Sequence, residues 1–155
     1  MDELLRQLLQ EEQELQFKNF NEATAWQVGC QLVERAQSER LPVTIDITRG
    51  SHQLFHASLS GTSPDNDEWI KRKVRLVYRF GHSSFYIGQL LKSKGQRIEE
   101  AYLLSESDYA PHGGCFPVFL RDTGVIGTIT VSGLPQEEDH KLVVGAIRDY
   151  LAGEK

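Results

Sequence analysis

The chain has 155 residues, of which 39% are hydrophobic, and its formal net charge is −5. A chain of this length usually forms one domain, which we expect to span residues 1–155. The acidic balance argues against binding to nucleic acid or to an anionic membrane surface. No apolar run approaches the roughly 20 residues that cross a bilayer. The acidic N-terminus is unlike a signal peptide, and Cys30 and Cys115 suit reduced thiols, so we expect a cytoplasmic protein.

Hydrophobic periodicity and turn-forming residues divide the chain into short elements. They predict, in chain order, a helix over residues 4–15, a helix capped by Asn21 and reaching residue 36, strands over 43–48 and 54–59, a helix from Asp65 or Asn66 to Gly81, a helix from Ser83 or Ser84 to Gly95, strands over 116–120 and 125–131, and a helix over 135–153. A short extended run is expected at 15–17, and the segment before residue 116 shows no regular pattern.

The strands are expected to pair as hairpins. Apolar Val43, Ile45 and Ile47 alternate with polar residues, so one face of this strand would meet a core and the other would meet water. Short turns join both pairs of neighbouring strands, which implies antiparallel pairing. Several amphipathic helices must cover such a sheet. The predicted class is therefore α+β, an antiparallel sheet of about five strands flanked by helices.

Two glycine-containing corners form the candidate ligand site. His112-Gly113-Gly114 precedes a strand, where glycines let a ligand approach the backbone. Ser132-Gly133 follows the return strand and leads into the last helix, whose first N–H groups suit a carboxylate or phosphate. Because the two strands form one hairpin, both corners emerge at the same end of the sheet, which predicts a shared pocket. Taken singly, each corner is explained as well by a tight turn or a helix cap.

Other side chains offer weaker sites. His140 borders the predicted pocket, but neighbouring helical side chains diverge, so Asp139 cannot readily orient it in a serine-hydrolase triad. Nothing in the sequence predicts a depressed pKa for Cys115, which favours a structural thiol over a nucleophile. On a strand, His52 and His56 would lie about 13 Å apart, too far to share an ion, so no metal site is predicted.

One predicted helix is locally basic within the acidic chain. Its cationic residues are Arg72, Lys73, Arg75 and Arg79. Such a run usually forms a solvated face. Trp69 beside it suits a core or an interface better than a stacking platform. Trp69 and Arg72 are therefore candidates for an interface or for the rim of the pocket.

Several segments together resemble one uncharacterised cytosolic family of the GlcG/HbpS-like superfamily, whose domain is called the haem-degrading domain. The matching segments are Asn21 to Gly29, Leu41 to Asp46, Leu54 to His56, Gly61 to Asn66, Trp69 to Lys73, His112 to Gly114 with Phe116-Pro117, Gly127, Val131 to Pro135, and Asp139-His140. They follow one another in the right order over essentially the whole chain. This resemblance is far more specific than any single motif.

The resemblance implies a profilin-like, three-layer α/β/α fold with a five-stranded antiparallel sheet. It also implies homo-oligomers, from dimers upward. Some relatives in the superfamily bind haem, and a few are associated with haem degradation or sensing, so haem is one candidate cofactor for this chain, whose cofactor the sequence leaves unknown. His112 and His140 are the candidate iron ligands, because both border the predicted pocket.

Three functions remain open from the sequence. The first is an oligomeric protein that binds a small anionic or planar ligand, with haem as one candidate, between His112-Gly113-Gly114 and Ser132-Gly133. The second is a homo-oligomeric interaction scaffold without a small ligand, in which the glycine corners and Trp69 serve packing between subunits. The third is a haem-degrading enzyme, which the superfamily name alone suggests.

Overall fold

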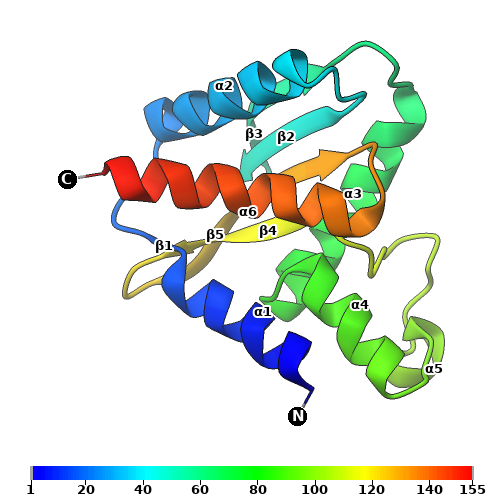
Figure 1. Cartoon of the computed structure of the whole chain (residues 1–155). Coiled ribbons are helices and arrows are strands. Elements are labelled where there is room, and N and C mark those ends of the chain that lie inside the picture. Colours follow the sequence, from blue (N-terminus) through cyan, green and yellow to red (C-terminus); the bar gives the residue numbers. More distant parts are fainter. Residues whose placement is uncertain (1, 155) are drawn as a thin grey trace.

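Helices cover both faces of a central sheet (Figure 1). The computed structural model describes residues 2–154. The elements in chain order are α1 (Glu3–Glu14), β1 (Gln16–Phe17), α2 (Glu22–Ser38), β2 (Thr44–Arg49), β3 (His52–Ser58), α3 (Pro64–Phe80), α4 (Ser84–Ser93), α5 (Ile98–Tyr102), β4 (Cys115–Leu120), β5 (Gly124–Ser132) and α6 (Gln136–Gly153). The sequence pattern predicted each of these except α5, which is five residues long and too short to show a helical period.

The five strands lie in the order β1-β4-β5-β2-β3. The hairpins β2–β3 and β4–β5 are antiparallel as predicted, and β5 joins them by pairing with β2, also antiparallel. β1 pairs with β4 in parallel, so the sheet is mixed rather than wholly antiparallel. This difference arises because β1 follows α1 directly and no hairpin turn fixes its direction. The predicted α+β class and three-layer arrangement are confirmed.

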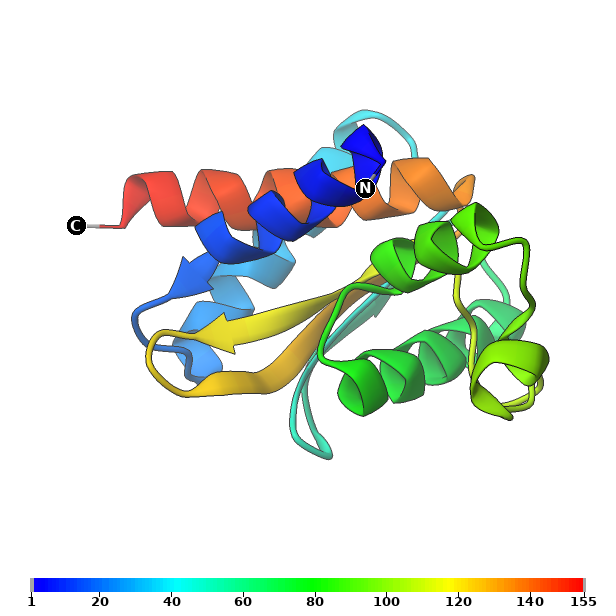
Figure 2. The same cartoon turned by 90° about the horizontal axis from the view of Figure 1, so that it is seen from below.

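The two faces of the sheet meet different helices. α2 and α6 lie against one face and α3 against the other, as the edge-on view shows (Figure 2). β2 is therefore buried on both faces, and the prediction of a half-buried strand is wrong. Ile45 and Ile47 enter the core under α2 and α6. The polar side chains face α3 instead, where the Thr48 hydroxyl lies 2.8 Å from the hydroxyl of Tyr78.

Side-chain caps set where the helices start. Asn21 caps α2 as predicted, because its side chain accepts the Thr24 N–H at 3.0 Å. α3 begins earlier than predicted: Ser63 is the residue before the helix, and the Asn66 side chain accepts the Ser63 N–H at 2.9 Å. Asn66 thus supports the cap from inside the first turn, which places its amide beside the end of β5. Within residues 2–154, no helix is long and apolar enough to cross a membrane.

Candidate functional site

A cavity of about 360 Å³ opens where α3 begins, β5 ends and α6 begins. It is lined by Asp65, Asn66, Trp69, Lys73, His112, Ser132, Gly133, Leu134, Gln136 and Asp139. Its volume lies near the lower end of the range for small-molecule sites, about 300–1,000 Å³. Residues of both corners singled out in the sequence thus meet at one cavity: His112, Ser132 and Gly133 line it, whereas Gly113 and Gly114 are not among its lining residues.

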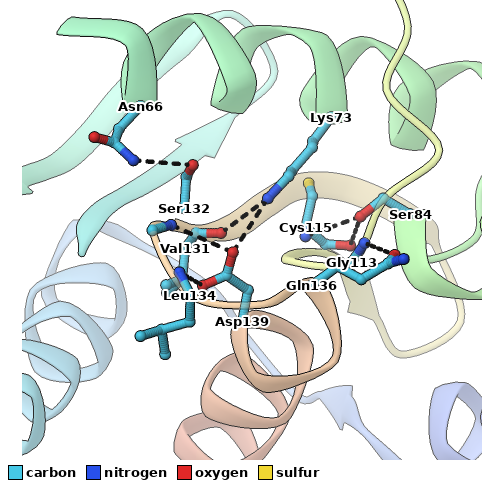
Figure 3. Close-up of polar contacts among 11 residues, drawn as sticks. Asn66, Lys73, Ser84, Gly113, Cys115, Val131, Ser132, Leu134, Gln136 and Asp139 are labelled. Atoms are coloured by element: carbon cyan, nitrogen blue, oxygen red, sulfur yellow. Dashed lines mark hydrogen bonds and ion pairs between the residues drawn. The ribbon is translucent and has the colours of Figure 1, made fainter. Parts of the chain in front are cut away.

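Lys73 and Asp139 both line this cavity and point toward each other (Figure 3). The Nζ atom of Lys73 lies 3.5 Å from Asp139 Oδ2 and 3.4 Å from the carbonyl oxygen of Val131. Lys73 is only 3% exposed and Asp139 only 2%. Both contacts of the ammonium are long for a charged hydrogen bond, whose usual length is about 2.7–2.9 Å. The site therefore holds a buried cation that its protein partners satisfy weakly.

The burial of Lys73 corrects the prediction of a fully solvated basic face. Arg75 and Arg79 are exposed as expected, but Lys73 points into the protein. The signal was present in the sequence: Lys73 follows Ile70 by three residues and precedes Val77 by four, so it lies on the apolar stripe of α3. A lysine on that stripe must either extend its ammonium to solvent or find a partner inside the fold.

Asp139 is held by backbone as well as by Lys73. Its Oδ1 accepts the Leu134 N–H at 2.9 Å, and its Oδ2 accepts the Gly133 N–H at 3.3 Å. Burial raises the pKa of Asp139 to about 6, against the opposing effects of Lys73 and the two N–H groups. Burial also lowers the pKa of Lys73, against the attraction of Asp139. The environment thus penalises the charged form of both partners.

One backbone N–H group in each glycine corner already has a protein partner. Gly113 donates to the side-chain oxygen of Gln136 at 2.9 Å, and Gly133 donates to Asp139. The sequence suggested that such groups bind the carboxylate of a ligand. At Gly113 and Gly133, side-chain oxygens of the protein accept these hydrogen bonds instead. Gly114 contributes in another way, because its φ is +135° and a Cβ there would lie 2.7 Å from Lys73 Nζ. Its missing side chain leaves room for the ammonium.

His112 and Trp69 form the aromatic side of the cavity. Their rings meet edge to face, with centroids 5.6 Å apart. Within residues 2–154, the His112 imidazole makes no hydrogen bond to a protein group, and burial lowers its pKa. The Arg72 guanidinium lies 4.4 Å from the Trp69 ring centroid and so lies at this rim. His112 is therefore a neutral imidazole with free ring nitrogens near pH 7.

His140 lies outside the cavity. Its Nε2 lies 2.7 Å from Glu11 Oε1 of α1, its ring packs against Phe85, and it is 3% exposed. Successive side chains at the start of α6 thus diverge, with Asp139 facing the cavity and His140 facing α1. Cys115 is fully buried, and burial raises its pKa to about 12, which keeps it a protonated thiol. Within the described residues, no group of three potential metal-binding side chains occurs.

Comparison with known proteins identifies the family. A family model described as "Haem degrading protein HbpS-like" matches residues 20–148. The chain belongs to the HbpS-like family. The match runs from the residue before the Asn21 cap to the last third of α6, so it includes every residue that lines the cavity.

Relatives match this HbpS-like protein over most of their length. It is 47% identical over 147 residues to a UPF0303 protein of Psychromonas ingrahamii, covering 95% of this chain and 92% of that protein. It is 48% identical over 145 residues to a UPF0303 protein of Streptomyces coelicolor, covering 94% and 92%. The crystal structure of the Ybr137w protein superposes with a TM-score of 0.89 at 33% identity, covering 96% of this chain and 87% of that one. The PduOC:heme complex shares the fold, with a TM-score of 0.66 at 20% identity, covering 80% and 89%.

The raised pKa of Asp139 predicts a specific dependence of stability on pH. Between about pH 4 and pH 6, the folded protein keeps a proton on Asp139 that the unfolded chain, with a pKa of 3.8, releases. The contribution of Asp139 to the free energy of unfolding should therefore fall as the pH rises through this window. Burial also raises the pKa of Asp46, which acts in the same direction, and lowers the pKa of His112, which acts in the opposite direction, so the comparison with a variant at Asp139 is what isolates this contribution. The contribution of Asp139 is at most about 3 kcal/mol, because each pKa unit is worth about 1.4 kcal/mol.

Urea unfolding of the wild type and of Asp139→Asn, measured across this window, checks that dependence. The difference between the two proteins should shrink as the pH falls, because asparagine does not titrate. His82, whose pKa is raised by its hydrogen bond to Glu12, loses its contribution only as the pH rises above about 6.5 and so acts outside this window. A pH-independent difference between wild type and Asp139→Asn would contradict the prediction.

Proposed function

We propose that this HbpS-like protein binds a small ligand in the Lys73–Asp139 cavity, with His112 and Trp69 as the contacts that select it. The observation that carries the proposal is the His112 imidazole, which lines the cavity beside an aromatic ring and makes no hydrogen bond within residues 2–154. The ring nitrogens of His112 are not among the buried polar atoms that lack a partner, so they stay open to solvent or to a ligand in the cavity. An unpaired, half-buried imidazole next to an open cavity is suited to a ligand.

Haem is the first ligand to test. A neutral imidazole with free ring nitrogens is a common ligand of haem iron, and Trp69 and Leu134 offer apolar contact to a planar ring. The family description names haem, and one structural neighbour is a haem complex. Bound haem would supply an iron centre for small-molecule or electron chemistry. Because the cavity lies at the small end of the usual range, the haem edge would extend into its open mouth.

Haem titration followed in the Soret region tests this proposal. We expect a saturable spectral shift at one haem per chain, and at least a tenfold weaker affinity in His112→Ala, which corresponds to about 1.4 kcal/mol. His52→Ala is the matched control, since His52 is exposed on β3 and pairs with Arg49, at the opposite end of β2 from Thr44, which pairs with Ser132 of the cavity. His140→Ala should keep the shift, because His140 pairs with Glu11.

Two outcomes would contradict the haem proposal. One is the absence of any saturable shift in the wild type. The other is an equal loss of affinity in His112→Ala and His52→Ala, which would place the haem elsewhere on the surface.

An interaction scaffold is the second candidate, and Trp26 favours it. Its side chain is 63% exposed and meets the Phe55 ring at 5.7 Å, beside the edge strand β3. Exposed aromatic pairs at a sheet edge are typical of contacts between chains. We propose this surface as the contact between copies in a homo-oligomer. The cytoplasmic location and any haem-degrading activity stay predictions.

A further inference from the structure

Ligand binding through His112 and Trp69 gives no role to the buried amine of Lys73. Its ammonium lines the cavity, yet its side chain is 4% exposed and its two protein contacts, to Val131 and Asp139, are both 3.4 Å or longer. An ammonium has three N–H donors, so at least one is left for a ligand. Burying a lysine in this way costs the fold stability. A chemical role for the amine would explain why it is kept.

Asp139 is placed to exchange protons with the amine of Lys73. Asp139 comes from the first turn of α6, and its carboxylate is fixed by the N–H groups of Gly133 and Leu134. Gly114 leaves the space in which Nζ sits, because a Cβ at that position would lie 2.7 Å from it. A rigid carboxyl group at 3.5 Å from the amine can take and return protons without moving a helix or a strand.

We propose that Lys73 condenses with the carbonyl group of a small aldehyde or ketone to form an imine, with Asp139 as its proton carrier. The inference rests on the cavity being a ligand site, but it does not require the ligand to be haem. Burial lowers the pKa of the Lys73 amine, which favours the nucleophilic neutral form. The other ionisable groups that act on Lys73 or respond to it are Cys115 of β4, the neighbouring Arg72, and His112.

The chemical steps balance within this pair. A proton passes from the Lys73 ammonium to the Asp139 carboxylate, and the freed lone pair on Nζ forms a bond to the carbonyl carbon. The carbonyl oxygen takes the proton from Asp139, and the nitrogen then returns a second proton to Asp139, which gives a neutral carbinolamine. The nitrogen lone pair forms the C=N bond as the hydroxyl leaves with the proton of Asp139 as water. One protonated imine and one water result, with no oxidant or reductant.

The cavity walls indicate a neutral, polar carbonyl compound with a flat or short carbon skeleton. Among the lining residues, Lys73 is the one lysine or arginine, and Asp139 already balances its charge. A carboxylate is therefore disfavoured beside Lys73, although the Arg72 guanidinium next to Trp69 is available to one. Ser132 and Asn66, whose side chains lie 3.5 Å apart, can hydrogen-bond a hydroxyl group. Trp69 and Leu134 provide apolar contact for the carbon skeleton.

Reductive trapping tests the proposal inside a single molecule. The full chain is mixed near pH 7 with limiting 4-hydroxybenzaldehyde, or with glycolaldehyde, plus cyanoborohydride, and modified lysines are quantified by peptide mass spectrometry. Lys71 is the internal control, because it lies on the same helix with a side chain 61% exposed. We expect Lys73 to be modified roughly a hundredfold faster than Lys71, the lower end of what a positioned proton carrier supplies.

Variants separate chemistry from accessibility. Asp139→Asn keeps the shape and the lysine, and should bring Lys73 down to the rate of Lys71, whereas Lys73→Arg should lose the Lys73 adduct and leave Lys71 labelling unchanged. In the wild type, the Lys73 rate should reach its plateau at a lower pH than the Lys71 rate. The inference is overturned if neither aldehyde labels Lys73 faster than Lys71. It is also overturned if the labelling rate of Lys73 is unchanged in folded Asp139→Asn. Trapping needs no haem, so a failed haem titration and a failed trapping experiment are separate results.

Discussion

Gly114→Ala is expected to destabilise the protein by about 2–6 kcal/mol, the sum of backbone strain and overpacking. Gly114 has a φ of +135°, and a Cβ there would lie 2.4 Å from the Val131 carbonyl oxygen and 2.7 Å from Lys73 Nζ. The carbonyl belongs to a strand in the middle of the sheet and cannot move away. The added methyl group must therefore push β5 or the lysine out of position.

Gly124→Ala separates strain from crowding. Gly124 has a similar backbone conformation, with a φ of +116°, but nothing lies within 4 Å of an added Cβ. Gly124→Ala should lower the free energy of unfolding only by the backbone strain, about 1–3 kcal/mol. Chemical denaturation of both variants gives the comparison, and haem or aldehyde labelling of the folded fraction shows whether the cavity survives. Equal destabilisation of the two variants would mean that Gly114 does not serve the Lys73 site.

The elements that local chemistry determines were predictable from the sequence. The Asn21 cap, the two hairpins and the apolar face of α6 all follow from residues within one turn or one strand of each other. The meeting of His112 with Ser132-Gly133 was also predictable, because a hairpin brings its two open ends together. Each of these features is set by residues that lie close together in the sequence or in one hairpin.

Features that depend on distant partners were not predictable. Two residues of β1 contain no signal for parallel pairing with β4, about 100 residues later in the chain. His140 faces Glu11 because α1 crosses α6, which no local pattern reveals. The burial of Lys73 was visible as a lysine on an apolar stripe, but its partner Asp139 lies 66 residues away. The meeting of the two corners at one cavity thus followed from topology, while the side chains that give the cavity its chemistry are brought there by tertiary contacts.

Lys73→Met is expected to cost about 3–5 kcal/mol, because it leaves Asp139 buried without its cation. The methionine side chain fills most of the volume of the lysine, so the loss measures charge rather than a cavity. Lys71→Met is the matched control on the same helix: Lys71 pairs with Glu68 at an exposed surface, and its loss should change stability by no more than about 1 kcal/mol. Urea denaturation at pH 7 gives both values.

The double variant Lys73→Met, Asp139→Asn decides what the pair is for. Because the double variant leaves neither charge buried alone, it should be more stable than the sum of the two single effects predicts, by about 1–3 kcal/mol. A buried ion pair can often be replaced by uncharged groups at little cost to stability. If the double variant is nearly as stable as the wild type, the charged pair is not kept for stability, which supports a chemical role. Strictly additive effects would show that Lys73 and Asp139 do not act as a pair.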